Sequence, residues 1–290
     1  MYNPLYEKMI QRGINICKNE EAETQSQIIS KLLKGSRGMD YSILRDTDAF
    51  FLSTSKHAVK LFGSSALDPE NDIFDPMGNH RYLNKIIFPL YNAEDHIVGL
   101  IGHDPFQKII RRDIERLEKK EQLTEQEQEK LNDLKSKRAL KYILPSSNIA
   151  PSRLHIYFPK GVYRKCVKDG YAVIVDGMFD CIQLNYLGIN SLCLMGSSIS
   201  PEMFFMLSFI KTKFVAYDND SSGVGVYRKI IRKFPDAVPI KNRVTGDIDE
   251  YINKFGGNDI KAAIENRLST GLIRPIILMG NSKNRFRKDV

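Results

Sequence analysis

The second half of the chain shows a regular alternation of apolar runs and segments with helical spacing. Short runs rich in Val, Ile, Leu and Phe predict strands, and the amphipathic segments between them predict helices. The predicted strands cover 171–175, 191–195, 213–217 and 237–240, and the predicted helices cover 180–187, 201–210 and 223–233. Apolar strands separated by helices predict an α/β fold, a parallel sheet covered by helices on both faces.

The first half has a different pattern. Apolar residues recur at helical spacing at Ile10 and Ile14 and again over 28–33, and the pattern is broken at Gly35 to Gly38, which predicts two helices within 1–50. The runs 85–90 and 97–102 read as strands, and the turn residues between them predict a β-hairpin. We therefore expect a mixed α+β region before the parallel sheet.

The segment 107–140 is dense in Glu, Lys, Arg and Gln. Ile110, Ile114 and Leu117 lie at helical spacing, and Thr124 followed by Glu127 fits a capping box that starts a second helix. The pattern predicts a helical hairpin inserted into the α+β region. Such a hairpin is either a solvated charged element or an arm that contacts nucleic acid or a protein partner.

These patterns divide the chain into four regions. We expect an N-terminal helical region at 1–50, a basic α+β subdomain at 51–167, a parallel-sheet domain at 168–256 and a C-terminal helix with a basic tail at 257–290. The length of 290 residues is enough for about two domains of roughly 150 residues and for a substantial core.

Charge and cysteine usage narrow the function. Lys and Arg number 43 against 35 Asp and Glu, and the net charge of +8 favours an anionic partner, nucleic acid before a membrane surface. The four cysteines lack C-x-x-C or zinc-finger spacing, so zinc is not expected, and Cys181 and Cys193 lie in apolar segments typical of core thiols. Because no apolar run is long enough to span a membrane and no signal segment begins the chain, we expect a cytoplasmic protein.

Carboxylates follow three of the predicted strands. They are Asp176 after the first strand with Asp180 one helical turn later, Asp218 and Asp220 after the third, and Asp247 and Asp249 after the fourth. The carboxyl ends of parallel strands share one edge of the sheet, where ligands bind. A divalent cation relieves the repulsion among converging carboxylates, and oxygen ligands favour Mg²⁺ or Mn²⁺. Two such ions about 4 Å apart suit nucleotidyl transfer.

Each carboxylate also has a simpler interpretation. An Asp after a strand often caps the following helix, which applies to Asp180 and Asp220. Asp249 and Glu250 suit the first turn of a helix, where negative charge is favourable. The metal-site interpretation depends on the coincidence of aspartates at three strand ends.

Two of these segments resemble the TOPRIM domain, which is shared by bacterial-type primases, topoisomerases and several nucleases. The segment 173–180, Val-Ile-Val-Asp-Gly-Met-Phe-Asp, is similar to its first motif, a strand followed by Glu-Gly and an Asp three residues later. The segment 218–223, Asp-Asn-Asp-Ser-Ser-Gly, is similar to its Asp-x-Asp motif. The resemblance implies a Rossmann-like sheet flanked by helices.

Other segments resemble DnaG-type primases in particular. They are 81–90, similar to Arg-Phe-x-x-Arg-Ile-x-Phe-Pro-Ile, 97–103, similar to Val-Ile-Gly-x-x-Gly-Arg, 141–143, similar to Lys-Tyr-Leu, and 246–252, similar to Lys-Asp-x-Asp-x-Leu. The resemblance covers about 75–105 and 141–256, with the charged hairpin between them. Asp176 stands where the family has Glu, and His103 replaces a family Arg. No zinc ribbon or helicase-binding domain is evident, as expected for a compact bacteriophage primase core.

The resemblance implies a DNA primase that makes short RNA primers on single-stranded DNA from ribonucleoside triphosphates. Metal-dependent nucleotidyl transfer would use two Mg²⁺ or Mn²⁺ ions and no zinc. The implied catalytic residues are Asp176, Asp218 and Asp220. The implied metal ligands are these three together with Asp247 and Asp249. Asp180 is implied to contact the ligands without binding the metal itself. The implied nucleic-acid contacts are Arg81, Lys85, His103, Lys141 and Lys160, with Tyr82 and Tyr142 as stacking residues. A replicative helicase or a separate template-recognition protein is a further implied partner, and binding to a membrane is not expected. If the protein is encoded by a phage, the expected compartment is the host cytoplasm.

Two other functions remain open. A TOPRIM nuclease would use the same carboxylates, although it has no need of the Phe88-Pro89 segment. A non-catalytic nucleic-acid-binding replication accessory protein would explain Asp176 in place of the family Glu. A type IA topoisomerase is not expected, because it needs a nucleophilic Tyr on further domains.

Overall fold

The computed structural model describes residues 2–74, 80–136, 140–147, 149–150, 156–195, 199–217 and 221–280. The chain forms two compact units. Unit 1 comprises Met1–Pro89 and Ile97–Ile149, and unit 2 comprises Leu90–His96 and Ala150–Val290. The predicted basic tail at 283–288 lies outside the described residues. No helix within the described ranges is long and apolar enough to cross a membrane.

Unit 1 begins with the two predicted helices, α1 (Pro4–Asn19) and α2 (Ala22–Arg37). Asn3 caps α1, because its side-chain oxygen accepts hydrogen bonds from the first backbone N–H groups. The helix α2 continues through Gly35 and ends at Gly38, whose φ of 68° is a left-handed conformation that glycine adopts readily. The predicted break therefore lies at the second of the two glycines.

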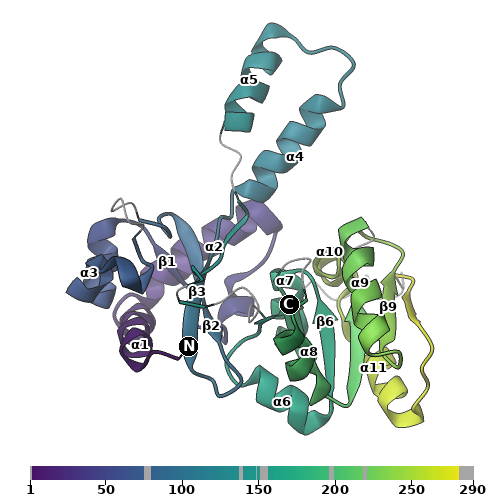
Figure 1. The fold of residues 1–290 in the computed structure, drawn as a ribbon. Coiled ribbons are helices and arrows are strands. Elements are labelled where there is room, and N and C mark those ends of the chain that lie inside the picture. The colour runs from purple at the N-terminus through teal and green to yellow at the C-terminus, as the bar shows by residue number, and fades with distance from the viewer. Residues whose placement is uncertain are drawn as a thin grey trace. The chain divides into compact units, whose positions relative to one another are not determined.

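The sheet of unit 1 has the order β1-β2-β3-β4, and Figure 1 labels the first three of these strands. Its strands are β1 (Phe50–Leu52), β2 (Lys85–Tyr91), β3 (Ile97–His103) and β4 (Tyr142–Ile143). The pair β2 and β3 confirms the predicted hairpin. A helix, α3 (Ser55–Phe62), and three short 3₁₀ helices, η1 (Tyr41–Leu44), η2 (Ser64–Leu67) and η3 (Pro69–Asn71), complete the body of this unit.

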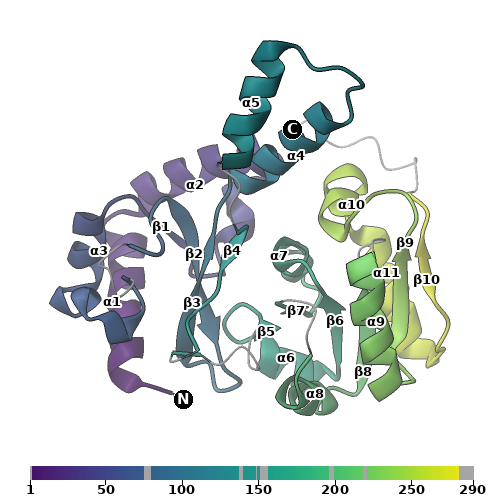
Figure 2. The same ribbon diagram turned by 45° about the horizontal axis from the view of Figure 1, so that its top comes forward.

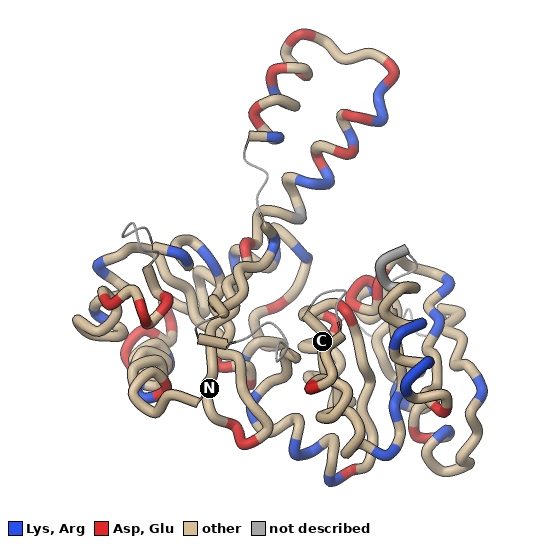
Figure 3. The backbone as a smooth tube through the Cα atoms, viewed as in Figure 1, with Lys and Arg blue, Asp and Glu red and all other residues tan. Residues whose placement is uncertain are grey.

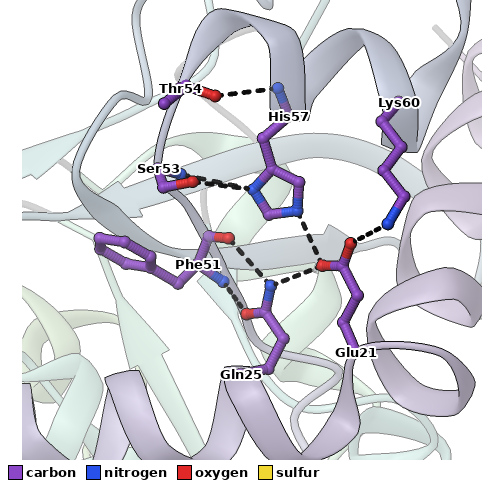
Figure 4. Close-up of polar contacts among 7 residues, drawn as sticks. All are labelled: Glu21, Gln25, Phe51, Ser53, Thr54, His57 and Lys60. Carbon is purple, nitrogen blue, oxygen red and sulfur yellow. Dashed lines mark hydrogen bonds and ion pairs between the residues drawn. The ribbon is translucent and has the colours of Figure 1, made fainter.

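A polar network joins α2, β1 and α3 (Figure 4). The buried Gln25 amide accepts from the Phe51 backbone N–H at 2.7 Å and donates to the Phe51 carbonyl at 3.2 Å. Glu21 contacts His57 Nε2 at 2.8 Å and Lys60 Nζ at 2.5 Å. The side chains at the start of α2 therefore complete the hydrogen bonding of a short strand and fix the position of α3.

The predicted helical hairpin is confirmed as α4 (Gln107–Glu118) and α5 (Glu125–Ser136). Thr124 and Glu127 form the expected capping box, in which each backbone N–H donates to the other residue's side chain, at 3.2 and 3.3 Å. The hairpin has a small apolar core of its own, composed of Ile110, Ile114, Leu117, Leu123, Leu131 and Leu134. This core stabilises the two helices against each other.

Unit 2 contains a six-stranded sheet in the order β10-β9-β8-β6-β7-β5 (Figure 2). The strands are β5 (Ile156–Tyr157), β6 (Tyr171–Val175), β7 (Ser191–Leu194), β8 (Thr212–Ala216), β9 (Val238–Asn242) and β10 (Ile276–Leu278). Only β5 is antiparallel to its neighbour, so the predicted parallel sheet is confirmed. The edge strands β5 and β10 are additions that the hydrophobic pattern did not predict.

The helices of unit 2 alternate with these strands. They are α6 (Val162–Asp169), α7 (Met178–Tyr186), α8 (Pro201–Ser208), α9 (Ser221–Lys233), α10 (Ile248–Phe255) and α11 (Asn258–Thr270). Cys181 and Cys193 are fully buried, as expected for core thiols. The turn residue Asp95 also belongs to this unit, because its carboxylate accepts from Gly161 N at 2.7 Å and pairs with Arg164 at the start of α6.

Candidate functional site

The strands that carry the predicted aspartates are neighbours in the sheet of unit 2. The strand β8 pairs with β6 on one side and with β9 on the other, and all three run parallel. Their carboxyl ends therefore lie along one edge, here called the carboxylate edge. Asp176 directly follows β6, and Asp247 lies five residues after β9. Asp218 and Asp220 follow β8 but lie outside the described residues.

Asp180 and Asp249 are joined directly at this edge. The backbone N–H of Asp249 donates to Asp180 Oδ1 at 2.6 Å, and both residues are buried, with 6% and 3% of their surface exposed. Gly177 makes this contact possible, because a Cβ atom there would lie 1.8 Å from Asp180 Oδ2. Asp180 therefore holds the first turn of α10, the helix that carries Asp249, against the start of α7.

Two amide side chains that the sequence analysis missed position Asp249. Gln183 Nε2 and Asn253 Nδ2 each donate to Asp249 Oδ1 at 2.7 Å. These two hydrogen bonds fix the orientation of the buried carboxylate. Gln183 lies three residues after Asp180 and Asn253 four after Asp249, so polar residues at helical spacing from a predicted ligand were the available signal.

Asp247 caps α10. Its Oδ1 atom accepts from Glu250 N at 2.7 Å, while Glu250 Oε2 accepts from Gly246 N at 3.0 Å. Asn242, the last residue of β9, donates to the Asp247 carbonyl at 2.9 Å and so ties the loop to the strand end. Asp247 is therefore a helix cap, a role that the sequence analysis considered for Asp180 and Asp220, and the cap fixes its carboxylate at the edge.

The donor chemistry of the carboxylate edge fits a hard divalent cation. Asp176, Asp180, Asp247 and Asp249 offer carboxylate oxygens, the ligands that Mg²⁺ and Mn²⁺ prefer. Within the described ranges, no three His, Cys, Asp or Glu residues come close enough together to hold a metal ion. A site at this edge would therefore need Asp218 or Asp220 in addition.

Two of the predicted nucleic-acid contacts of unit 1, Arg81 and Lys85, form ion pairs with carboxylates. Arg81 pairs with Asp72 and also donates to the Leu144 carbonyl at 3.1 Å. Lys85 Nζ lies 3.4 Å from Asp104 Oδ2. These ion pairs orient both side chains and reduce the charge that they present to an external anion.

Lys141 and Lys160 are more accessible. Lys141 is half-buried, with its Nζ atom 5.2 Å from the centroid of the Tyr142 ring, which is also half-buried. Lys160 in unit 2 is exposed and follows the buried strand β5 by three residues. Both lysines can therefore contact a phosphate without rearrangement of the core.

His103 and Tyr82 occupy a different environment from the one expected. Both are fully buried, with no exposed surface, and the Tyr82 hydroxyl donates to the Leu100 carbonyl at 3.2 Å. Burial first, and then the cations Arg37, Lys141 and Lys85, hold the pKa of His103 well below its ordinary value. A neutral and inaccessible imidazole does not fit a phosphate contact, and a buried Tyr82 does not fit base stacking.

Comparison with known proteins adds a family context. The chain matches no model of a protein family. It is 23% identical over 269 residues to a DNA primase of Aquifex aeolicus (strain VF5), a match that covers 87% of this chain and 46% of that protein. The chain thus spans less than half the length of this curated relative.

Solved structures with a similar fold are primase cores. The zinc-binding and RNA polymerase domains of the Aquifex aeolicus primase superimpose with a TM-score of 0.64 and 19% identity, over 90% of this chain and 60% of that one. A DnaG primase catalytic domain bound to single-stranded DNA superimposes with a TM-score of 0.61 and 14% identity, over 90% of this chain and 78% of that one.

Proposed function

Because the chain has the fold of the DnaG primase catalytic core and a DNA primase among its homologues, we propose that it synthesises short RNA primers on single-stranded DNA. The observation that carries the proposal is the adjacent position of β6, β8 and β9, each of which leads into aspartates at one edge. The reaction would be metal-dependent nucleotidyl transfer from ribonucleoside triphosphates.

The carboxylate edge supplies the catalytic groups in this proposal. Asp176, Asp218, Asp220 and Asp247 would hold two Mg²⁺ or Mn²⁺ ions, as in a TOPRIM domain. Ions held there would supply charge neutralisation for the incoming triphosphate and for the attacking ribose 3′-hydroxyl. Asp249 would contribute a ligand oxygen, and Gln183 would keep that carboxylate oriented. No covalent nucleophile on the protein is required.

Asp180 has a positioning role in the proposal. Its carboxylate accepts the backbone N–H of Asp249, so it fixes where α10 begins relative to α7. Asp247 caps the same helix. The hydrogen bond between the Asp249 N–H and Asp180 therefore helps to fix the positions of both Asp247 and Asp249, the carboxylates that follow β9. The edge is thereby organised before any substrate binds.

The template would be single-stranded DNA. One of the similar solved structures, a DnaG primase catalytic domain, is bound to single-stranded DNA. Lys141 and Lys160 are the predicted contacts that remain accessible, and Arg81 and Lys85 would contact phosphates only in exchange for their carboxylate partners. A replicative helicase or a separate template-recognition protein is a further proposed partner.

Primer synthesis by the purified chain tests this function. The protein is incubated with single-stranded DNA, ribonucleoside triphosphates and Mg²⁺ or Mn²⁺, and short RNA products are resolved on a gel. We expect products from the wild type, none from Asp218→Asn, and wild-type amounts from Asp236→Asn, an exposed Asp away from the carboxylate edge. Shortened DNA would instead indicate a nuclease, and DNA binding with neither product would indicate an accessory protein.

A further inference from the structure

The helix α9 carries an exposed face of positive charge. It contains Arg228, Lys229, Arg232 and Lys233, all exposed, and no Asp or Glu (Figure 3). We refer to these four residues as the α9 cationic face. Arg228, Arg232 and Lys233 form no ion pair with any residue that the structure describes.

The position of these residues follows from the packing of the helix. Val226, Ile230 and Phe234 are buried and recur every four residues, so they form the inner face of α9 and its C-terminal cap region. The cations come two and three residues after Val226 and after Ile230, and all four are exposed. Arg228 and Arg232, like Lys229 and Lys233, are at i,i+4 spacing, where like charges destabilise a helix.

Helix stability explains only two of the four cations of α9. A cation in the last turn is favourable because it faces the negative end of the helix dipole, and this accounts for Arg232 and Lys233. Arg228 and Lys229 lie in the middle of the helix, where the dipole gives no such benefit. An external anion would offset the repulsion among all four residues.

Unit 2 as a whole is the more basic part of the molecule. It holds 21 Lys and Arg against 15 Asp and Glu, which is +6 of the total net charge of +8, although it also holds the carboxylate edge. Residues 281–290, which lie outside the described part of the chain, account for +3 of this excess, with Lys283, Arg285, Arg287 and Lys288 against Asp289. The α9 cationic face provides four of these charges within six residues.

The face also starts close to the predicted site. The helix begins at Ser221, directly after Asp218 to Asp220, so Arg228 lies about 10 Å and Lys233 about 18 Å along its axis. Near the start, the half-buried rings of Tyr217 and Tyr227 stack with centroids 4.6 Å apart. Aromatic rings beside cations are typical of surfaces that bind nucleic acid.

We propose that the α9 cationic face binds the phosphate backbone of nucleic acid where the strand passes the carboxylate edge. This inference rests on the proposed nucleic-acid function but not on catalysis. Contacts to phosphates carry no base specificity, so the face would hold any sequence and would act as a track along unit 2.

A charge-neutralised variant tests the proposal. The variant has all four residues of the face changed to Gln, which keeps helix propensity. Its affinity is measured for a fluorescent thymidine oligonucleotide and for a short primer–template duplex, each over a range of salt concentrations. We expect at least a tenfold loss of affinity, and the slope of log K against log salt should fall by about 0.7 per lost contact for the single strand and about 0.9 for the duplex. The substrate with the larger loss identifies the strand that the face binds.

A matched control separates the face from net charge. The control has Lys8, Lys31, Lys34 and Lys56 changed to Gln, four exposed lysines of unit 1, so both variants lose four positive charges. The proposal is overturned if the two variants bind DNA equally well with equal salt slopes. A third variant, Arg228→Lys with Arg232→Lys, should bind like the wild type, and circular dichroism should show that all variants are folded.

The outcomes distinguish this proposal from the proposed function. If the wild type makes primers but the four substitutions do not change DNA binding, the proposal for the α9 cationic face is overturned and the proposed primase function stands. If DNA binding depends on the face but the wild type makes no primers, the primase function is overturned and the proposal for the face stands. Loss of binding to an acidic peptide but not to DNA would show that the face serves a protein partner and would overturn the proposal.

Discussion

At the scale of single residues, Gly177 determines how closely α7 and α10 approach. Its φ of −99° suits any residue, so the glycine is required by the Asp180 carboxylate and not by backbone conformation. In Gly177→Ala, we expect Asp180 to move, the Asp249 N–H to lose its acceptor, and primer synthesis to fall. Overpacking of this kind costs about 1–3 kcal/mol. Thermal unfolding and gel assays of primers measure the two effects.

Gly225→Ala is the matched control for this substitution. Gly225 lies in α9 with no atom within 4 Å of an added Cβ. Alanine should therefore stabilise the helix by up to about 1 kcal/mol and leave synthesis intact. Equal behaviour of the two variants would contradict the role assigned to Gly177.

His103 gives a prediction about pH. Its pKa is lowered in the folded state by burial and nearby cations, so the unfolded chain binds a proton that the folded chain does not. Stability should be unaffected above the ordinary His pKa of about 6.5 and should fall as the pH drops below it. His103→Phe removes this titration, so its melting temperature should decrease less than that of the wild type between pH 7.5 and pH 5.5. An identical decrease in both proteins would show that His103 is protonated in the fold.

At the scale of elements, Gln25 connects α2 to the three-residue strand β1. In Gln25→Ala the Phe51 N–H and carbonyl lose their partner inside the protein, and each unsatisfied group costs about 1–3 kcal/mol. We expect a lower melting temperature and faster amide exchange in the peptide that contains Phe50–Leu52. Gln27→Ala, two residues further along α2 and exposed, should change neither quantity.

The α4–α5 hairpin should unfold locally, without unfolding of the body of unit 1. Leu131 is buried in a cluster made only of hairpin residues, and truncation of a buried Leu to Ala costs about 2–5 kcal/mol. We expect Leu131→Ala to increase amide exchange in Gln107–Glu118 and Glu125–Ser136 without a change in β2. Lys130→Ala, an exposed neighbour in α5, is the control. Increased exchange in β2 of the Leu131 variant would show that the hairpin and the body unfold together.

Elements with clear periodicity could be predicted, and the shortest ones could not. The capping box at Thr124 is a short motif with a fixed spacing, and the alternation after Tyr171 contains enough residues to define a period. The strands β5 and β10 have two and three residues, which is too few for any pattern. The role of His103 was inferred from its alignment with a family Arg, which carries no information on burial, and the structure buries it at the end of β3.

At the scale of the whole molecule, the candidate site depends on strand order, which the hydrophobic pattern does not contain. The sequence analysis placed aspartates after three strands, but only the order β9-β8-β6 brings those strand ends side by side. Gln183 escaped prediction because its contact with Asp249 joins α7 to α10 and spans 66 residues of the chain, whereas Asn253 lies four residues after Asp249 in the same helix. Long-range contacts of this kind follow from the assembled fold and not from local spacing.

The division into two units predicts where a metal ion acts. The predicted ligands all belong to unit 2, and a ligand that binds only the folded state stabilises it by about 2.7 kcal/mol at 100 times its Kd. Mg²⁺ or Mn²⁺ should therefore slow amide exchange in α7 and α10, where Asp180 and Asp249 are joined, and leave α1 unchanged. Asp218→Asn combined with Asp220→Asn should abolish the effect. Ligands that converge at the carboxylate edge make the slowing of amide exchange local to this edge and dependent on Asp218 and Asp220. Equal protection of α1 and α10, or protection that persists in the double variant, would therefore mean that the ion binds elsewhere.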